Sequence, residues 1–261
     1  FPAQYGGRLS GIVDVSVSDG NNETYHGSAT IGVLSAKLHA EGPIVRGKTT
    51  FNFSGRVSYF DAIAEPVLRS IYDSKNTLSQ YSNMNYYDVT AKVTHKFNNN
   101  NRVSATFYIG QDKVKDSPSS SHQNSKQIVT DDLGTYEALL SNSESYSTNN
   151  KWGNNILSLH WESALTNKLF MNVFATYSSY KYKLRNTSNS SKLSSKSDNI
   201  ADTLSYSYEN SYAQYNSGIE DYSANLDFEY LPNHWNKIKA GAKFSSQEFI
   251  PMASICDPTY M

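Results

Sequence analysis

The sequence has a single cysteine, Cys256, and no long run of apolar residues. One cysteine excludes an internal disulfide and any metal site that needs several cysteines. Hydrophobic residues make up 38% of the chain and the mean hydropathy is −0.58, so no segment approaches the roughly 18 consecutive apolar residues of a membrane-spanning helix. An excess of one charge is missing too, because the net charge is −1, which gives no reason to expect nucleic acid as a partner.

Motifs that carry catalysis or bind cofactors are also missing. The six histidines have no H-x-x-x-H or other close ligand spacing. Gly6, Gly7 and Gly11 are not a phosphate-binding loop, because no strand precedes them and no Lys-Ser/Thr follows. Asp131 and Asp132 are a two-carboxylate run, which is more typical of a solvated loop than of a calcium site. We therefore expect no enzymatic activity, no metal and no cofactor.

Aromatic residues and period-two alternation are what the sequence has in abundance. It contains 20 Tyr, 11 Phe and 3 Trp. About nine segments alternate apolar and polar residues, the pattern of a half-buried strand, and no segment predicts a long helix. These segments lie near 24–33, 35–43, 51–59, 87–93, 102–109, 157–162, 169–177, 222–230 and 237–244. The sequence therefore predicts an all-β fold.

The connections between these strands alternate between long and short. Long segments, at 61–85, 113–151 and 184–216, are predicted to be loops. Tight turns are expected near 45–48, 98–101, 165–167 and 232–235. A soluble sandwich has no reason to place all its long loops at one end, whereas an outer-membrane barrel has short periplasmic turns and long external loops.

The placement of charged and aromatic residues favours the same architecture. None of the predicted apolar-face positions is Asp, Glu, Lys or Arg, and a Lys or Arg facing lipid costs about 2–4 kcal/mol at the bilayer midplane. Aromatic residues gather at strand ends as two girdles, although ordinary β-propensity also places them in strands. The girdle beside the long connections holds Tyr59, Tyr87, Tyr177 and Tyr222, and the one beside the tight turns holds Phe97, Trp161, Tyr230 and Trp235. The pattern favours a transmembrane antiparallel β-barrel.

Three stretches carry a resemblance to a known family. The opening "QYGGRLSGIVDVSVSDG" resembles the final strand of the plug domain of TonB-dependent outer-membrane transporters, in which a Tyr/Phe-Gly-Gly-Arg-like turn precedes a Val-rich strand. The stretch "YHGSATIGVLSAKLHAEGPIVRGKTTFNFSGRVSYFD" is similar to the first three barrel strands, including the Glu-Gly-Pro turn at 41–43. The stretch "DYSANLDFEYLPNHWNKIKAGAKFSSQEFIP" is similar to later hairpins. The resemblance covers most strand segments and little of the loops, and its most specific part is the plug-to-barrel junction.

The resemblance implies that the sequence is a fragment. Residues 1–20 would be the C-terminal end of the plug, and residues 21–261 would be the N-terminal part of a plugged barrel, about nine of roughly 22 strands. The implied function is energy-coupled import of a scarce nutrient across the bacterial outer membrane. The implied partners are outer-membrane lipid, a TonB-type periplasm-spanning protein acting through the missing N-terminal region, the unknown nutrient and the surface lipoprotein with which such transporters often work.

Two sets of residues are candidates for the sites of such a transporter. Arg8 is predicted to lie inside the barrel near lumen-facing carboxylates, where a buried guanidinium needs a partner. The candidate carboxylates are Glu41, Glu162 and Glu229. Tyrosines in the three long connections are predicted to contact the nutrient or a capping partner, because Tyr, Ser and Asn together make adaptable binding loops. They are Tyr72, Tyr81, Tyr136, Tyr146, Tyr206, Tyr208, Tyr212 and Tyr215.

Two other functions remain open from the sequence. A passive porin would share the barrel and the girdles but would have no plug, so residues 1–20 favour the transporter. A soluble carbohydrate-binding β protein would share the loops rich in Tyr and Asn, but would not need charge-free apolar faces. The identity of the nutrient cannot be read from the chain, because fold does not fix function.

Overall fold

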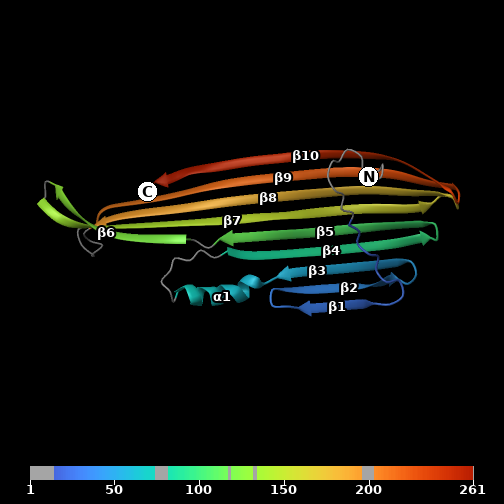
Figure 1. Ribbon diagram of the computed structural model, residues 1–261, viewed down its shortest axis with the longest axis horizontal. Coiled ribbons are helices and arrows are strands. Elements are labelled where there is room, and N and C mark those ends of the chain that lie inside the picture. The colour runs from blue at the N-terminus through green and yellow to red at the C-terminus, as the bar shows by residue number, and fades with distance from the viewer. Residues whose placement is uncertain (1–14, 74–81, 117–118, 132–133, 196–202, 261) are drawn as a thin grey trace.

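The chain forms one antiparallel sheet of ten strands and one helix (Figure 1). The computed structural model describes residues 15–73, 82–116, 119–131, 134–195 and 203–260. The elements are β1 (His26–Ile31), β2 (Ser35–Val45), β3 (Thr49–Ser58), α1 (Phe60–Asp73), β4 (Ser82–Asn98), β5 (Asn101–Asp116), β6 (Ser119–Asp131), β7 (Gly134–Ala164), β8 (Leu169–Ser195), β9 (Thr203–Asn233) and β10 (Asn236–Tyr260). The prediction of an all-β fold is confirmed.

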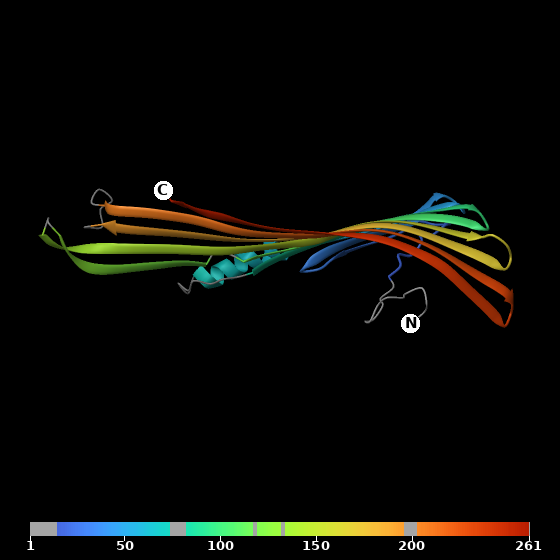
Figure 2. The same ribbon diagram turned by 90° about the horizontal axis from the view of Figure 1, so that it is seen from above.

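The strands pair almost entirely in chain order. The sheet runs β1-β2-β3-β4-β5-β7-β8-β9-β10, and β6 lies off this path as a hairpin partner of β7. Every pairing is antiparallel. Within the described residues β1 and β10 pair with one neighbour each, so the sheet is open. Figure 2 shows that it is twisted and, toward the tight turns, curved around residues 15–24.

The strand register separates the side chains into two faces. One continuous row of paired residues is Ala40, Phe53, Ala91, Phe107, Leu157, Tyr177 and Tyr222. The adjacent row, one residue further along each strand, is Glu41, Asn52, Lys92, Thr106, Ser158, Thr176 and Ser223. Because successive side chains point to opposite faces of a strand, these rows mark an apolar face and a polar face.

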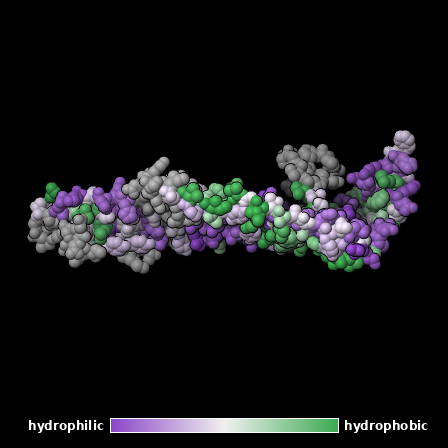
Figure 3. All heavy atoms as spheres, turned by 90° about the horizontal axis from the view of Figure 1, so that it is seen from below, coloured by the Kyte–Doolittle hydropathy of each residue, from purple (hydrophilic) through white to green (hydrophobic). Residues whose placement is uncertain are grey.

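The apolar face carries a charge-free belt of side chains that we call the apolar band. It is formed by Phe51–Val57 of β3, Val89–Val93 of β4, Val103–Ile109 of β5, Leu157–Trp161 of β7, Leu169–Tyr177 of β8, Tyr222–Tyr230 of β9 and Ile238–Phe244 of β10, taking alternate residues. The edge-on view in Figure 3 shows hydrophobic residues along the convex side of the sheet near the tight turns. The polar face is the concave one.

The apolar band is not covered by a second layer. Leu159 is 49% exposed, Trp161 44% and Phe244 68%, and Ala138 is the only buried hydrophobic residue in the part of the chain that the structure describes. A sheet in a water-soluble domain buries one face against another layer of structure. No helix among the described residues is long and apolar enough to cross a membrane.

The predicted long loops at 113–151 and 184–216 are wrong for the described residues. Strand β5 continues to Asp116, β6 and β7 fill most of the rest of the first segment, and β8 and β9 continue to Ser195 and from Thr203. These extensions are rich in Ser, Asn, Tyr and Lys on both faces. Backbone pairing persists there although the composition is typical of a solvated loop, and alternation continues only in parts, as in Tyr180 and Tyr182 of β8 and Tyr206 and Tyr208 of β9.

The segment 61–85 was also predicted to be a loop, and its first part is the helix α1. Ile63 and Val67 are four residues apart, as on one helix face. Pro66 lies between them, and because an interior proline removes a backbone donor it argues against a helix at the sequence level. The Asn85 amide of β4 donates to the carboxylate of Asp61 in the first turn, which holds the helix beside the sheet.

Candidate functional site: the N-terminal segment on the concave face

Residues 15–24, which we call the N-terminal segment, lie on the concave polar face (Figure 2). They have no regular secondary structure, so residues 15–17 of the predicted plug strand are not in a strand. Lys92 Nζ donates to the carbonyl oxygen of Val17 at 2.6 Å, and Asn52 Nδ2 donates to that of Ser18 at 3.3 Å. The segment thus lies across β3 and β4.

Asp19 makes the strongest contacts of the N-terminal segment. Its Oδ1 accepts a hydrogen bond from Thr94 Oγ1 at 2.8 Å and lies 2.8 Å from Lys92 Nζ. Its Oδ2 lies 2.7 Å from Arg102 Nη1. One carboxylate therefore joins the segment to both β4 and β5. Such charge-assisted hydrogen bonds are about twice as strong as those between neutral groups.

Gly20 lets the chain approach the sheet closely. A Cβ atom at this position would lie 1.9 Å from the carbonyl oxygen of Phe51, a backbone atom that cannot move aside cheaply. Any side chain at position 20 would push the segment away from β3. The Asp19-Gly20 pair therefore combines a charged contact with the absence of a side chain.

The contacts of Asp19 extend into a wider polar cluster. Arg102 also pairs with Glu162 of β7 through Nε and Nη2. His160 Nε2 lies 3.4 Å from the side-chain oxygen of Asn172, and its ring stacks on Phe174 at 3.8 Å between centroids. Five strands, from β3 to β8 without β6, thus contribute to one network on the concave face.

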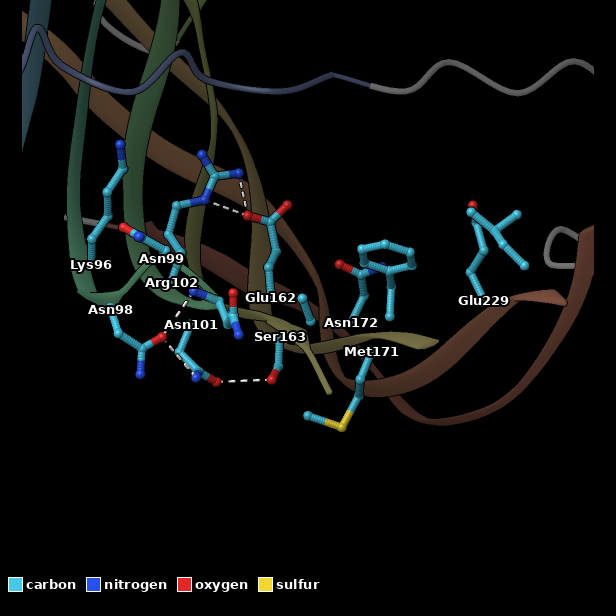
Figure 4. Close-up of a pocket in the computed structure, with 14 residues that line it drawn as sticks. Lys96, Asn98, Asn99, Asn101, Arg102, Glu162, Ser163, Met171, Asn172 and Glu229 are labelled. Carbon is cyan, nitrogen blue, oxygen red and sulfur yellow. Dashed lines mark hydrogen bonds and ion pairs between the residues drawn. The ribbon is translucent and has the colours of Figure 1, made fainter. Parts of the chain in front are cut away.

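A hollow of about 650 Å³ lies beside this cluster at the tight-turn end. Figure 4 shows Lys96, Arg102 and Glu162 projecting toward the N-terminal segment, whereas Met171 points to the opposite face. The floor is the β4–β5 turn, where Asn98 Oδ1 accepts from the backbone of Asn100 at 2.9 Å. Most of its lining residues are polar, with both signs of charge, and Phe170 and Leu231 are among its apolar ones.

Electrostatics favour the ionised form of Asp19. Partial burial by itself raises the pKa of this carboxyl group. The hydrogen bonds from Lys92 and Thr94 and the positive charges of Lys92 and Arg102 outweigh that effect and hold the pKa below its ordinary value of 3.8. Above that pH the contact is therefore at full strength.

The carboxylates predicted to hold Arg8 lie on the concave face, and two of the three have other cationic partners. Arg8 is outside the described residues, so its contact stays a prediction. Glu162 pairs with Arg102, and Glu229 lies 2.6 Å from Lys237 Nζ and 3.4 Å from Lys239 Nζ. Glu41 faces Asn52 in the register and makes no ion pair within the described residues. Of the three, Glu162 is the one linked to the N-terminal segment, through Arg102.

The predicted tyrosine set is spread over the part of the sheet away from the tight turns. Tyr81 is outside the described residues, Tyr72 lies in α1, Tyr136 and Tyr146 in β7, and Tyr206, Tyr208, Tyr212 and Tyr215 in β9. Tyr206, Tyr208 and Tyr212 share the face of Tyr222, whereas Tyr215 lies on the other face. The four β9 tyrosines therefore do not form one site on one face, and ligand contact stays a prediction.

The sequence reasoning missed Asp19, Lys92 and Arg102 as a functional group. The prediction paired a cation near the N-terminus, Arg8, with carboxylates on the sheet, whereas the structure shows a carboxylate in the N-terminal segment and cations on the sheet. The signal was available, because Lys92 and Arg102 were both assigned to polar strand faces. Only the pairing of β4 with β5 shows that the two cations are close together, because it places Lys96 opposite Arg102 and Lys92 opposite Thr106.

The arrangement can hold and release a segment of chain. The Asp19 cluster contains a carboxylate, two cations and a hydroxyl, and no cysteine. Among the described residues no three His, Cys, Asp or Glu side chains are placed to hold a metal ion. Comparison of the chain with family models, with curated proteins and with solved structures found no match.

Proposed function

We propose that this chain forms part of the wall of a transmembrane β-barrel in the bacterial outer membrane, and that the barrel imports a scarce nutrient as the TonB-dependent transporters that it resembles do. The apolar band carries the proposal. Monomeric soluble proteins rarely expose contiguous apolar patches larger than a few hundred Å². The band crosses seven of the strands on one face, from β3 to β10, and lipid is a partner that would cover all of it.

The height of the band fits a bilayer. On β8 it runs from Leu169 to Tyr177, about nine residues, which at roughly 3.4 Å per residue is ~30 Å of strand. A strand tilted by about 45° needs 9–11 residues to cross the hydrocarbon core. Tyr177 and Tyr222, whose ring centroids are 4.9 Å apart, stand at one margin of the band, where interfacial aromatic residues belong.

The N-terminal segment supports a plugged transporter over the passive porin. In this interpretation residues 15–20 are the end of a plug that lies on the inner wall and is held there by Asp19. A TonB-type partner would pull on the plug from the periplasm, and a surface lipoprotein or the nutrient would meet the strand extensions outside. The open edges of β1 and β10 would pair with further strands of the barrel, because unpaired backbone groups are not tolerated in lipid.

The environment of the two faces tests the membrane location. Spin labels would be attached, one at a time, to cysteines replacing Leu159 and Ser158 in the natural full-length protein with Cys256→Ser, in outer membranes. We expect the label at 159 to collide with oxygen dissolved in lipid, and the label at 158 with a water-soluble nickel complex. If the label at 159 collides with the nickel complex instead, the proposed barrel wall is contradicted.

Energy coupling separates the transporter from the porin. Deletion and complemented strains would be compared on media limiting in iron, cobalamin, oligopeptides or glycans, and uptake of the nutrient that distinguishes them would be measured. We expect uptake to stop when a protonophore collapses the inner-membrane gradient or the TonB-type protein is deleted. Uptake that continues unchanged would identify a porin on the same scaffold.

A further inference from the structure

Three lysines stand in one row across three strands beyond the apolar band. Lys113 of β5 faces Lys151 of β7, which in turn faces Lys183 of β8. Directly opposite residues of a sheet have Cβ atoms about 4.5–5.5 Å apart, and like charges in such pairs are destabilising. None of the three makes an ion pair with another described residue. Lys115, Lys181 and Arg185 lie on the same face in the two adjacent rows, and we call these six residues the basic patch.

The basic patch lies on the convex face, where the apolar band ends. The band ends at Ile109 on β5, and Lys113 follows on the same face after Gln111. On β8 the band ends at Tyr177, and Lys181 is the second residue beyond it on that face. Lys113 and Lys181 are thus each four residues beyond the end of the band. At ~3.4 Å per residue this is about 14 Å along the strand, and less along the membrane normal because the strand is tilted. Long lysine side chains keep their stems on apolar surface while their ammonium groups reach polar surroundings.

A hollow of about 550 Å³ connects the band to the basic patch. Gly153 and Gly218 line it, and a Cβ at Gly153 would lie 2.5 Å from the carbonyl oxygen of Gly110, so that a larger residue does not fit there. Ile109, Ile250 and Met252 supply apolar walls. Lys151, Lys181 and Lys183 stand around it, and Glu220, also in the lining, marks its side toward β9 and β10.

An apolar hollow surrounded by cations complements an amphiphile with a phosphorylated headgroup. We propose that the basic patch binds the phosphate groups of an outer-leaflet glycolipid, with part of an acyl chain or sugar in the hollow. Bound phosphates would neutralise the row of Lys113, Lys151 and Lys183, none of which has an ion-pair partner among the described residues. The proposal rests on the proposed membrane location, and it adds a lipid site to the outer wall that does not take part in transport.

Binding of defined lipids to the natural full-length protein tests the proposal. The probes are bisphosphorylated lipid A, its dephosphorylated form and inorganic phosphate, with the protein in uncharged detergent. The test variant is Lys113→Gln/Lys151→Gln/Lys183→Gln. The matched control, Lys48→Gln/Lys126→Gln/Lys192→Gln, makes the same change in charge away from the patch.

Each lysine near a lipid surface contributes about a fivefold change in binding, so we expect the triple variant to lose on the order of a hundredfold in affinity for bisphosphorylated lipid A. The wild type should bind the dephosphorylated form and inorganic phosphate far more weakly, and the control variant should bind like the wild type. In lipid-free detergent the test variant should unfold at a higher temperature, because the like-charge row is gone. That second readout also shows that the variant is folded.

Equal lipid A affinity in the test and control variants would overturn the headgroup site. So would wild-type protein that binds dephosphorylated lipid A or free phosphate as tightly as the bisphosphorylated lipid. If the spin labels place the apolar band in water, the proposed function fails independently of these measurements. A band in lipid together with unchanged lipid A binding would remove only the headgroup site.

Discussion

Asp19 joins the N-terminal segment to the sheet through two cations and a hydroxyl. Its partners come from different strands, so that the carboxylate positions the segment along the sheet as well as against it. The side chain of Lys92 is only 14% exposed and that of Asp19 30%. Exposed ion pairs contribute little, but this pair is largely shielded and is supported by neutral hydrogen bonds.

Replacing Asp19 with Asn should loosen the N-terminal segment. The change leaves Lys92 without its carboxylate and Arg102 with Glu162 alone, and we expect a cost of about 1–2 kcal/mol in the docking equilibrium. Hydrogen–deuterium exchange of residues 15–24 in the natural full-length protein would measure it as roughly five- to thirtyfold faster exchange. Glu23→Gln is the matched control, because it removes a carboxylate of the same segment that makes no ion pair within the described residues.

The contact of Asp19 with the sheet should also depend on pH. The folded-state pKa of Asp19 lies below its ordinary value of 3.8, so the stabilising contribution is complete above 3.8 and is lost as the pH falls through the lowered pKa. A carboxyl resonance of Asp19 followed by NMR should titrate below 3.8. Titration at or above 3.8, or unchanged exchange in Asp19→Asn, would show that the carboxylate does not hold the segment.

At the scale of the element, each long strand has a part that contributes to the apolar band and an extension beyond it. Strand β7 alternates apolar and polar residues only from Leu157 toward its end at Ala164, although it is 31 residues long. Its remainder pairs with β6, with the end of β5 and with the far half of β8, mostly through polar residues. In the alternating part of β7, an introduced charge should affect the stability of the protein differently on the two faces.

Leu159→Lys should destabilise the protein, and Ser158→Lys should not. A lysine on the lipid face near the bilayer midplane costs about 2–4 kcal/mol, whereas the polar face already carries Lys92 and Arg102. Urea unfolding of the natural full-length protein in lipid vesicles would measure the difference. In water, a lysine replacing a residue that is 49% exposed would cost almost nothing, so equal stability of the two variants would contradict a lipid-facing β7.

The whole molecule is a single layer with two open edges. Within the described residues, β1 and β10 each have one unpaired side, and the apolar band has no second layer over it. A long exposed edge strand is a template for aggregation, and an uncovered apolar face offers little net stability in water. The proposed barrel wall would account for both features, because further strands would pair with the open edges and lipid would cover the apolar band.

This chain expressed alone should therefore fail to form a stable monomer in water. We expect no cooperative thermal transition by near-UV circular dichroism, and sedimentation should show aggregates. The natural full-length protein in detergent should unfold cooperatively and far more slowly. A soluble monomer of this chain with a sharp transition would contradict the proposed barrel wall and would favour the soluble β protein.

Much of the fold follows from local sequence patterns. The alternation around Phe53, Phe107 and Leu226 is visible in the chain, because the period of two is a property of the extended backbone. Helix α1 was missed because Pro66 lies inside it, and an interior proline argues against a helix. The extensions of β8 and β9 were missed although alternation continues in parts of them, as in Tyr180 and Tyr182 against Lys181 and Lys183 of β8. Segments so rich in Ser, Asn and Lys are typical of solvated loops, and only pairing with neighbouring strands extends them.

The sequence alone determined that the chain is all-β and which side chains share a face along each strand, since both depend on residues within one strand. Only the tertiary structure decided that Asp19 lies between Lys92 and Arg102, because that contact joins residues more than seventy positions apart in the chain. It also decided that Lys113, Lys151 and Lys183 form one row, because the register between three strands brings them together. Strand pairing is a long-range choice, and the local pattern of any one strand does not contain it.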